Sequence, residues 1–145
     1  MTTIRHLTIL GSTGSIGVST LDVVARHPDR FQVVALTANN STEKMLEQCR
    51  RFQPRYAVML NAASGEKLQT EMRTAGLATE VLWGVESLEK VAALPEVDAV
   101  MAAIVGAAGI RPTFAAARAG KQVLLANKET MVMAGRIFMD LVKQH

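Results

Sequence analysis

The stretch that decides the fold runs from Leu7 to Gly17 and reads Leu-Thr-Ile-Leu-Gly-Ser-Thr-Gly-Ser-Ile-Gly. It begins with an apolar run typical of a buried strand and continues with three glycines, so we predict a strand, a glycine turn and a helix start. Backbone N–H groups at a helix N-terminus bind anions, and glycine lets the main chain approach them closely. The stretch therefore predicts a site for the phosphates of a dinucleotide, with added hydroxyl donors from Ser12, Thr13 and Ser15.

The glycine spacing is GxxGxxG and differs from the GxGxxG of the commonest nicotinamide enzymes. The motif alone is compatible with NAD, with NADP, or with an ordinary glycine turn between a strand and a helix. It is not a P-loop, because Val18 follows Gly17 where Lys-Ser or Lys-Thr would be required. We therefore do not expect nucleoside triphosphate binding.

The composition indicates one globular domain with an aliphatic core. The chain has 145 residues, of which 49% are hydrophobic and only 4% are aromatic, which suits buried parallel strands. The net charge is +3, and the basic residues are scattered without interleaved aromatic residues. We expect no nucleic-acid binding.

The cysteine content and the N-terminal residues bear on location. Cys49 is the single cysteine, which excludes an internal disulfide and fits a reducing compartment. Arg5 and His6 interrupt the N-terminal segment, so we expect no signal peptide. No apolar run approaches the roughly 18 residues of a membrane helix. We expect a cytoplasmic protein with no membrane contact.

Apolar runs alternate with helical patterns along the whole chain, which predicts an α/β fold with a doubly wound, mostly parallel, Rossmann-like sheet and helices on both faces. With no linker or repeat, residues 1–145 are expected to form one domain. Strands are expected near 6–10, 32–37, 56–60, 80–82, 97–104 and 122–126. Helices are expected near 15–26, 42–51, 62–75, 85–93, 112–119 and 129–143.

Two helices have apolar faces that we expect to pack on the sheet. The face of the first helix consists of Ile16, Thr20, Val23 and Val24. The face of the last helix consists of Met131, Ala134, Phe138, Leu141 and Val142.

The end of the second strand bears on cofactor choice. An NAD-binding fold of this type has an acidic residue about 20 residues after the glycine turn, where it binds the ribose 2′-hydroxyl. Here the chain has Asn39, Asn40 and Ser41, which would not repel a 2′-phosphate and offer it amide and hydroxyl groups. NADP is favoured. Asn40 or Ser41 also fits the N-cap of the next helix, and both interpretations can hold together.

A second candidate wall of the cofactor site is the run of small residues from Met101 to Gly109. Ligands of doubly wound sheets bind outside the carboxyl ends of the strands, where this run begins. Small residues would let a ligand come close. Small residues selected for helix–sheet packing are the equally weighted alternative.

A polar cluster formed by Asn127, Lys128 and Glu129 follows the last expected strand. The lysine can donate to an anion or a substrate hydroxyl, the amide can orient a ribose or nicotinamide, and the carboxylate can accept from hydroxyls. The alternative is a helix start, with Asn127 as the N-cap, Glu129 as a first-turn acid and Lys128 in solvent.

Other catalytic patterns are missing from the sequence. The thirteen acidic residues show no metal-binding spacing, and the three histidines lie far apart in the chain. There is no GxSxG motif, and Cys49 falls in an expected helix without an evident histidine partner. We expect neither a metal site nor a catalytic nucleophile in this chain.

Four segments together resemble the 1-deoxy-D-xylulose 5-phosphate reductoisomerase family: 7–17, 55–58, 102–109 and 125–129. The resemblance extends over essentially the whole chain but covers only the N-terminal, NADPH-binding part of that enzyme. We therefore expect His145 to mark a truncation. The family's catalytic, metal-binding and C-terminal domains would then be absent from this chain.

The resemblance implies an oxidoreductase of non-mevalonate isoprenoid biosynthesis. Family members rearrange 1-deoxy-D-xylulose 5-phosphate and reduce the resulting aldehyde with NADPH to 2-C-methyl-D-erythritol 4-phosphate. A divalent metal, Mg or Mn, polarises the substrate oxygens. The full-length enzyme is expected to be a homodimer that binds a sugar phosphate. For this chain alone we expect NADPH binding without turnover.

The resemblance also assigns roles to individual residues. Those expected to contact the cofactor phosphates are Thr13, Gly14, Ser15 and Ile16. Asn127 and Glu129 are expected at the nicotinamide half, and Lys128 at the substrate. The tip formed by Asn39, Asn40 and Ser41 departs from members that have a basic residue there, which weakens the expected 2′-phosphate contact.

Two other functions fit parts of the sequence. A semialdehyde dehydrogenase with similar glycine spacing would need a catalytic cysteine, and Cys49 is poorly placed to face a nicotinamide. A stand-alone, non-enzymatic nucleotide-binding or sensor module is the alternative of a different class. Its support is the lack of an acid–base or metal constellation.

Overall fold

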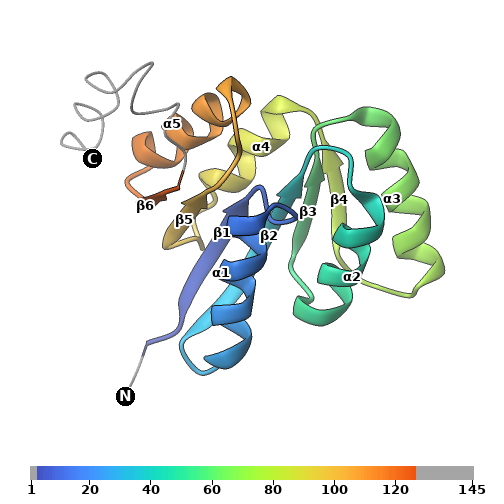
Figure 1. Ribbon diagram of the computed structural model, residues 1–145, viewed down its shortest axis with the longest axis horizontal. Helices are drawn as coiled ribbons and strands as arrows, with labels where there is room; N and C mark the ends of the chain where they lie inside the picture. Colours follow the sequence, from blue (N-terminus) through green and yellow to red (C-terminus); the bar gives the residue numbers. More distant parts are fainter. Residues whose placement is uncertain (1–2, 127–145) are drawn as a thin grey trace.

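The computed structural model describes residues 3–126 of the chain. Six strands form one parallel sheet in the order β4-β3-β2-β1-β5-β6 (Figure 1). Their bounds are β1 (Arg5–Leu10), β2 (Phe31–Ala38), β3 (Tyr56–Met59), β4 (Glu80–Trp83), β5 (Ala99–Ala102) and β6 (Gln122–Leu125). From β1 the chain builds outward in one direction and then returns to build in the other. The predicted doubly wound class is confirmed.

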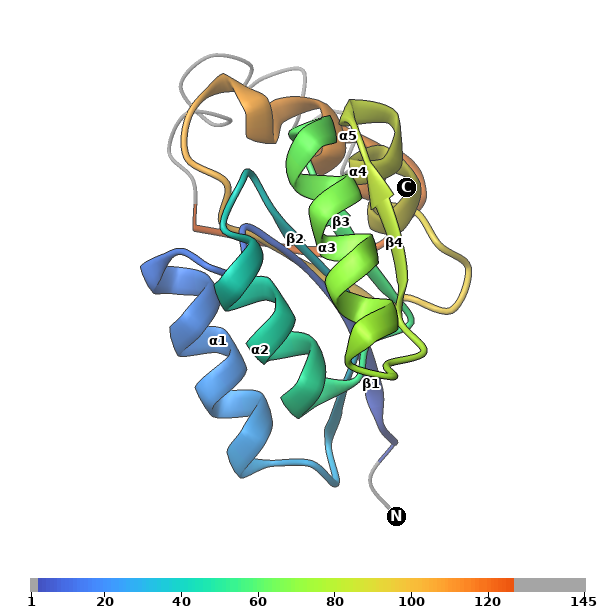
Figure 2. The same cartoon turned by 90° about the vertical axis from the view of Figure 1, so that its right-hand side faces the viewer.

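Helices cover both faces of this sheet (Figure 2). Their bounds are α1 (Ser15–Arg26), α2 (Thr42–Phe52), α3 (Ala62–Thr74), α4 (Val85–Ala92) and α5 (Ile110–Arg118), the last preceded by the 3-10 turn η1 (Ala107–Gly109). The first three pack on one face and α4 and α5 on the other. Neighbouring strand residues such as Ile9 and Leu10 point to opposite faces, and both are fully buried. The core is therefore aliphatic and two-sided.

Two predicted elements differ at their ends. The strand expected near 97–104 is confined to β5, because the chain leaves the sheet after Ala103 and reaches Gly106 at φ 85°. The helix expected from residue 112 already begins at Ile110. Pro112 fits this earlier start, since the first-turn N–H that proline lacks has no partner within a helix.

The predicted buried face of α1 is confirmed at Val24 and wrong at Ile16 and Val23. The buried residues are Gly17, Leu21 and Val24, whereas Ile16 is 46% exposed and Val23 is 50% exposed. The close contact of Gly17 with the glycine turn sets the rotation of the helix, so the residues four and seven positions later face the sheet. The apolar face expected in the helix near 129–143 lies outside the described residues.

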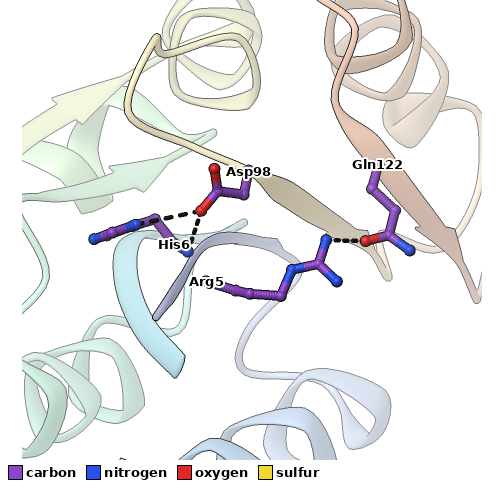
Figure 3. A network of polar contacts seen from close by, with 4 residues as sticks. All are labelled: Arg5, His6, Asp98 and Gln122. Carbon is purple, nitrogen blue, oxygen red and sulfur yellow. Dashed lines mark hydrogen bonds and ion pairs between the residues drawn. The ribbon is translucent and has the colours of Figure 1, made fainter. Parts of the chain in front are cut away.

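At the amino-terminal edge of the sheet, polar side chains link β1 to Asp98, which directly precedes β5, and to Gln122 of β6 (Figure 3). The carboxylate of Asp98 accepts a 2.8 Å hydrogen bond from the His6 backbone N–H and lies 3.3 Å from His6 Nδ1. The backbone hydrogen bond is the main cause that lowers the pKa of Asp98 below its usual value, and the His6 side chain adds to it. Nearby, the Arg5 guanidinium donates to the side-chain oxygen of Gln122.

Candidate functional site

A crevice of about 280 Å³ opens at the carboxyl ends of the strands. Three segments form most of its wall: the glycine turn with Thr13 and Gly14, the end of β2 with Asn39, and residues 103–105 after β5. β1 lies between β2 and β5 in the sheet, so these three strand ends are neighbours (Figure 1). The chain winds outward in both directions from this point, where doubly wound folds bind their ligands.

The three glycines of the turn serve different purposes. Gly11 has φ 82°, and a Cβ there would lie 2.7 Å from the Ala103 carbonyl oxygen. A Cβ at Gly17 would lie 2.2 Å from the Gly11 carbonyl oxygen. Packing therefore demands both of these glycines. A Cβ at Gly14 would have no protein atom nearer than 3.7 Å, so the space above Gly14 is open to a ligand.

Some backbone N–H groups of the turn have a hydrogen-bond acceptor within the described part of the chain, and others have none there. Gly11 donates to the Thr37 hydroxyl at 2.9 Å, and Ser12 donates to the Thr37 carbonyl at 2.8 Å. Among the described residues no acceptor is recorded for four of the N–H groups that follow, those of Thr13, Ser15, Ile16 and Gly17. A set of unpaired N–H groups at the start of a helix is an anion-binding arrangement.

The electrostatics of α1 favour the same ligand. The first turn of α1 has no acidic side chain, and its N-cap Gly14 provides no capping oxygen. The partial positive charge at this helix end is therefore not neutralised by the helix itself. A phosphate oxygen would supply the missing acceptor.

The prediction that Ser12 offers its hydroxyl to a phosphate is wrong. Ser12 is fully buried, and its hydroxyl lies 2.8 Å from Gln48 Oε1 and 3.2 Å from the Thr37 carbonyl oxygen. By contrast, Thr13 lines the crevice and Ser15 is exposed. Sequence alone does not distinguish the three hydroxyls, because Gln48 belongs to a distant helix.

The tip of β2 presents free polar side chains. Asn39 and Asn40 are exposed, and the side chains of Asn39, Asn40 and Ser41 make no recorded hydrogen bond among residues 3–126. Ser41 does occupy the N-cap position of α2, yet its hydroxyl forms no capping bond. No carboxylate occupies the tip. The side chains expected to meet a 2′-phosphate are therefore available.

The run of small residues after β5 forms the opposite wall, as the sequence suggested. Ala103, Ile104, Val105 and Ala108 line the crevice, and Val105 is 85% exposed. Leu60 and Leu88 also line it, and sequence reasoning missed them. Leu60 directly follows β3 at the same sheet edge. It could have been predicted, because ligands of doubly wound sheets bind outside the carboxyl ends of the strands. Leu88 lies within α4 and has no such signal.

The polar cluster of Asn127, Lys128 and Glu129 lies outside the described residues. The strand that leads to it is described: β6 pairs in parallel with β5 and ends at Leu125. The Ala126 N–H still donates to the Ala102 carbonyl at 3.0 Å. The chain therefore leaves β6 at the edge of the sheet that bears the crevice.

A larger hollow of about 590 Å³ lies at the opposite edge of the sheet. Its charged side chains are already paired: Arg55 with Glu96, and His6 with Asp98 outside the lining. None of its lining residues stands at the start of a helix, as the N–H groups of the glycine turn do. The smaller crevice is therefore the candidate phosphate site.

Other chemistry is sparse in the described part of the chain. Cys49 is buried in α2, and burial raises the pKa of its thiol to about 12. A neutral, buried thiol is no nucleophile. Among residues 3–126, no three His, Cys, Asp or Glu side chains gather as metal ligands would, and no helix has the length and apolarity needed to cross a membrane.

Sheet order, glycine turn and crevice define an α/β domain of the Rossmann type, a class of fold that binds dinucleotides at such a crevice. The family model for 1-deoxy-D-xylulose 5-phosphate reductoisomerase matches residues 7–135. The chain belongs to the 1-deoxy-D-xylulose 5-phosphate reductoisomerase family.

Curated relatives carry the same name. The protein from Nitrosospira multiformis is 81% identical over 145 residues, which are all of this chain and 37% of that protein. The protein from Nitrosomonas eutropha is 75% identical over 145 residues, again all of this chain and 35% of the relative. The chain thus spans little more than a third of the curated relatives it matches.

Solved structures show the same likeness. A crystal structure of DOX-P reductoisomerase in complex with NADPH, fosmidomycin and magnesium is 44% identical with a TM-score of 0.95, covering 98% of this chain and 35% of that one. The reductoisomerase from Zymomonas mobilis in complex with NADPH is 41% identical with a TM-score of 0.93, covering 100% and 38% of the two chains.

Proposed function

We propose that this chain is the NADPH-binding domain of an oxidoreductase that converts 1-deoxy-D-xylulose 5-phosphate to 2-C-methyl-D-erythritol 4-phosphate. The family assignment and the NADPH in two similar solved structures support this role. The main observation in favour of cofactor binding is the set of unpaired backbone N–H groups on both sides of Gly14 in the sequence, where a ligand has room to approach. We assign the enzymatic activity to the whole protein. The chain spans little more than a third of the length of its relatives.

In this proposal the glycine turn holds the cofactor pyrophosphate. The N–H groups of Thr13, Ser15 and Ile16 donate to phosphate oxygens, and the hydroxyls of Thr13 and Ser15 add further donors. Gly14 lets the phosphate approach the main chain. When bound, NADPH supplies the hydride for reduction.

The two ends of the cofactor are assigned to the two flanking strand ends. Asn39, Asn40 and Ser41 hydrogen-bond the 2′-phosphate through neutral groups, so its recognition lacks an ion pair at this tip. Beyond β6, we assign Asn127 and Glu129 to the nicotinamide half and Lys128 to the substrate, on the resemblance to the family.

We assign the divalent metal and the substrate phosphate to the remainder of the whole protein. Magnesium accompanies the similar solved enzymes, and a metal would polarise the substrate oxygens. The described residues offer no cluster for it. The whole enzyme is proposed to be a cytoplasmic homodimer that acts on a sugar phosphate and binds neither nucleic acid nor membrane.

Calorimetric titration of the chain with NADPH and with NADH tests the binding function. We expect saturable binding of one NADPH and at least about tenfold weaker binding of NADH, equivalent to 1.4 kcal/mol. Absence of NADPH binding would contradict the function. Equal affinities would contradict the assignment of the β2 tip to the 2′-phosphate.

A further inference from the structure

We propose that Gln48 is a positioning residue that fixes the direction of the phosphate-binding turn, an inference that rests on the proposed NADPH site. Gln48 belongs to α2 and lies 36 residues after Ser12 in the sequence, and it does not line the crevice. Its effect on a cofactor would therefore pass through the turn. Two contacts with Ser12 carry this inference.

The side-chain amide of Gln48 holds both the side chain and the main chain of Ser12. The Ser12 hydroxyl donates to Gln48 Oε1 at 2.8 Å, and Gln48 Nε2 donates to the Ser12 carbonyl at 2.9 Å. A carbonyl oxygen can only accept, so the amide nitrogen must face it and the orientation of the glutamine is fixed. One side chain thus restrains Ser12 at two atoms.

Thr37 at the end of β2 holds the same turn from another side. Its carbonyl accepts from the Ser12 N–H at 2.8 Å, and its hydroxyl accepts from the Gly11 N–H at 2.9 Å. Ser12 and Thr37 are both fully buried. Every polar group of Ser12 therefore has a partner, and a satisfied buried network of this kind is rigid.

The link to the ligand is the peptide bond between Ser12 and Thr13. A trans peptide is planar, so the Ser12 carbonyl and the Thr13 N–H point in opposite directions. Because Gln48 holds the Ser12 carbonyl, it also directs the Thr13 N–H away from that contact. Thr13 lines the crevice, and its N–H is among the unpaired donors. Gln48 thereby orients a phosphate donor that it does not touch.

The test compares two ligands of the chain: NADPH, which has the pyrophosphate, and adenosine 2′-monophosphate, which has only the 2′-phosphate. Gln48→Leu removes both hydrogen bonds to Ser12. Because the turn then loses its support, we expect about a tenfold loss of NADPH affinity. Adenosine 2′-monophosphate should keep its affinity within about twofold. Glu47→Ala, an exposed neighbour on α2, is the matched control and should change neither. Unchanged NADPH affinity, or equal losses for both ligands, would overturn the proposal.

A second variant separates the carbonyl contact from the hydroxyl contact. Ser12→Ala deletes the hydroxyl but keeps the bond from Gln48 to the carbonyl, so it should weaken NADPH binding less than Gln48→Leu. An equal or greater loss would show that the carbonyl contact does not set the turn.

Amide hydrogen exchange tests the positioning role without any ligand. In the free chain, Gln48→Leu should raise the exchange rates of the Gly11 and Ser12 amides about tenfold relative to amides in β3. Unchanged rates would overturn the role of Gln48. This measurement stays informative if the unsubstituted chain fails to bind NADPH, a result that would instead contradict the proposed function.

Discussion

At the scale of single residues, the glycine turn combines two packing glycines with one that serves a ligand. Gly11 and Gly17 are enclosed by protein backbone, whereas a Cβ at Gly14 would meet its nearest protein atom only at 3.7 Å. The glycines of the GxxGxxG pattern are therefore required for different reasons, two of them by packing and one by the approach of a ligand. Substitution by alanine separates them.

Gly14→Ala should fold normally and bind NADPH at least about tenfold more weakly than the unsubstituted chain. The added methyl meets no protein atom within 3.4 Å but occupies the approach of the phosphate. Thermal unfolding and calorimetric titration measure the two effects. Full NADPH affinity in this variant would refute the assignment of the pyrophosphate to the turn.

Gly17→Ala should show the opposite balance. Its methyl would lie 2.2 Å from the Gly11 carbonyl oxygen, so α1 or the turn must shift. We expect a loss of stability of about 1–3 kcal/mol, the usual range for overpacking. Urea unfolding monitored by circular dichroism gives this value. A variant as stable as the unsubstituted chain would show that this contact is not tight.

Cys49 should be inert while the chain is folded. Burial raises the pKa of its thiol to about 12, so almost no thiolate exists at pH 8. Ellman's reagent should label the chain in urea and leave the native chain unlabelled on the same time scale. Rapid labelling with unchanged circular dichroism would contradict the burial of this thiol.

At the scale of elements, the contact between β1 and Asp98, just before β5, makes the sheet sensitive to acid. The pKa of Asp98 is lowered by its bond from the His6 N–H, so the carboxylate contributes stability above its unfolded pKa of about 4. That contribution is lost as the pH falls through the lower, folded pKa. Both side chains are partly exposed, so it amounts to less than about 1 kcal/mol.

Asp98→Asn tests this pH dependence. The variant should be slightly less stable than the unsubstituted chain at pH 7, and the difference should shrink towards zero as the pH falls below about 4. Urea unfolding at a series of pH values measures it. A difference that stays constant with pH would mean that the charge of Asp98 contributes nothing.

The order and type of the described elements were predictable from sequence, and the inward face of α1 was not. Alternating apolar runs and glycine or proline boundaries identify all six strands, because the strands of a parallel sheet are locally apolar. Ile16 and Val23 misled the prediction, since they are apolar yet half exposed. The close approach of Gly17 to the turn decides the rotation, and hydropathy does not encode that contact.

At the scale of the whole molecule, local sequence motifs predicted the crevice but not the long-range contacts that α2 and α4 make with it. The turn, the β2 tip and the run after β5 are each visible in sequence, and topology brings them together. The two hydrogen bonds between Gln48 and Ser12 join α2 to the turn, and Leu88 reaches the crevice from α4. Such long-range contacts depend on the packed fold and leave no local pattern.

The chain alone should bind NADPH without catalysing the reaction. It spans little more than a third of its relatives, and catalysis needs metal and substrate held together with the cofactor. Incubation with 1-deoxy-D-xylulose 5-phosphate, NADPH and Mg²⁺ should give no 2-C-methyl-D-erythritol 4-phosphate by mass spectrometry. Product above the level of a Gly14→Ala control would refute the assignment of catalysis to the rest of the whole protein.

The proposed site of the cofactor is the glycine turn and not the larger hollow at the other edge of the sheet. An NMR titration of the ¹⁵N-labelled chain with NADPH tests it most directly. We predict saturable shifts concentrated at the amides of residues 13–17 and 39–41. Absence of saturable shifts, or shifts concentrated around Gln53, Arg55 and Thr79 in the larger hollow, would contradict it.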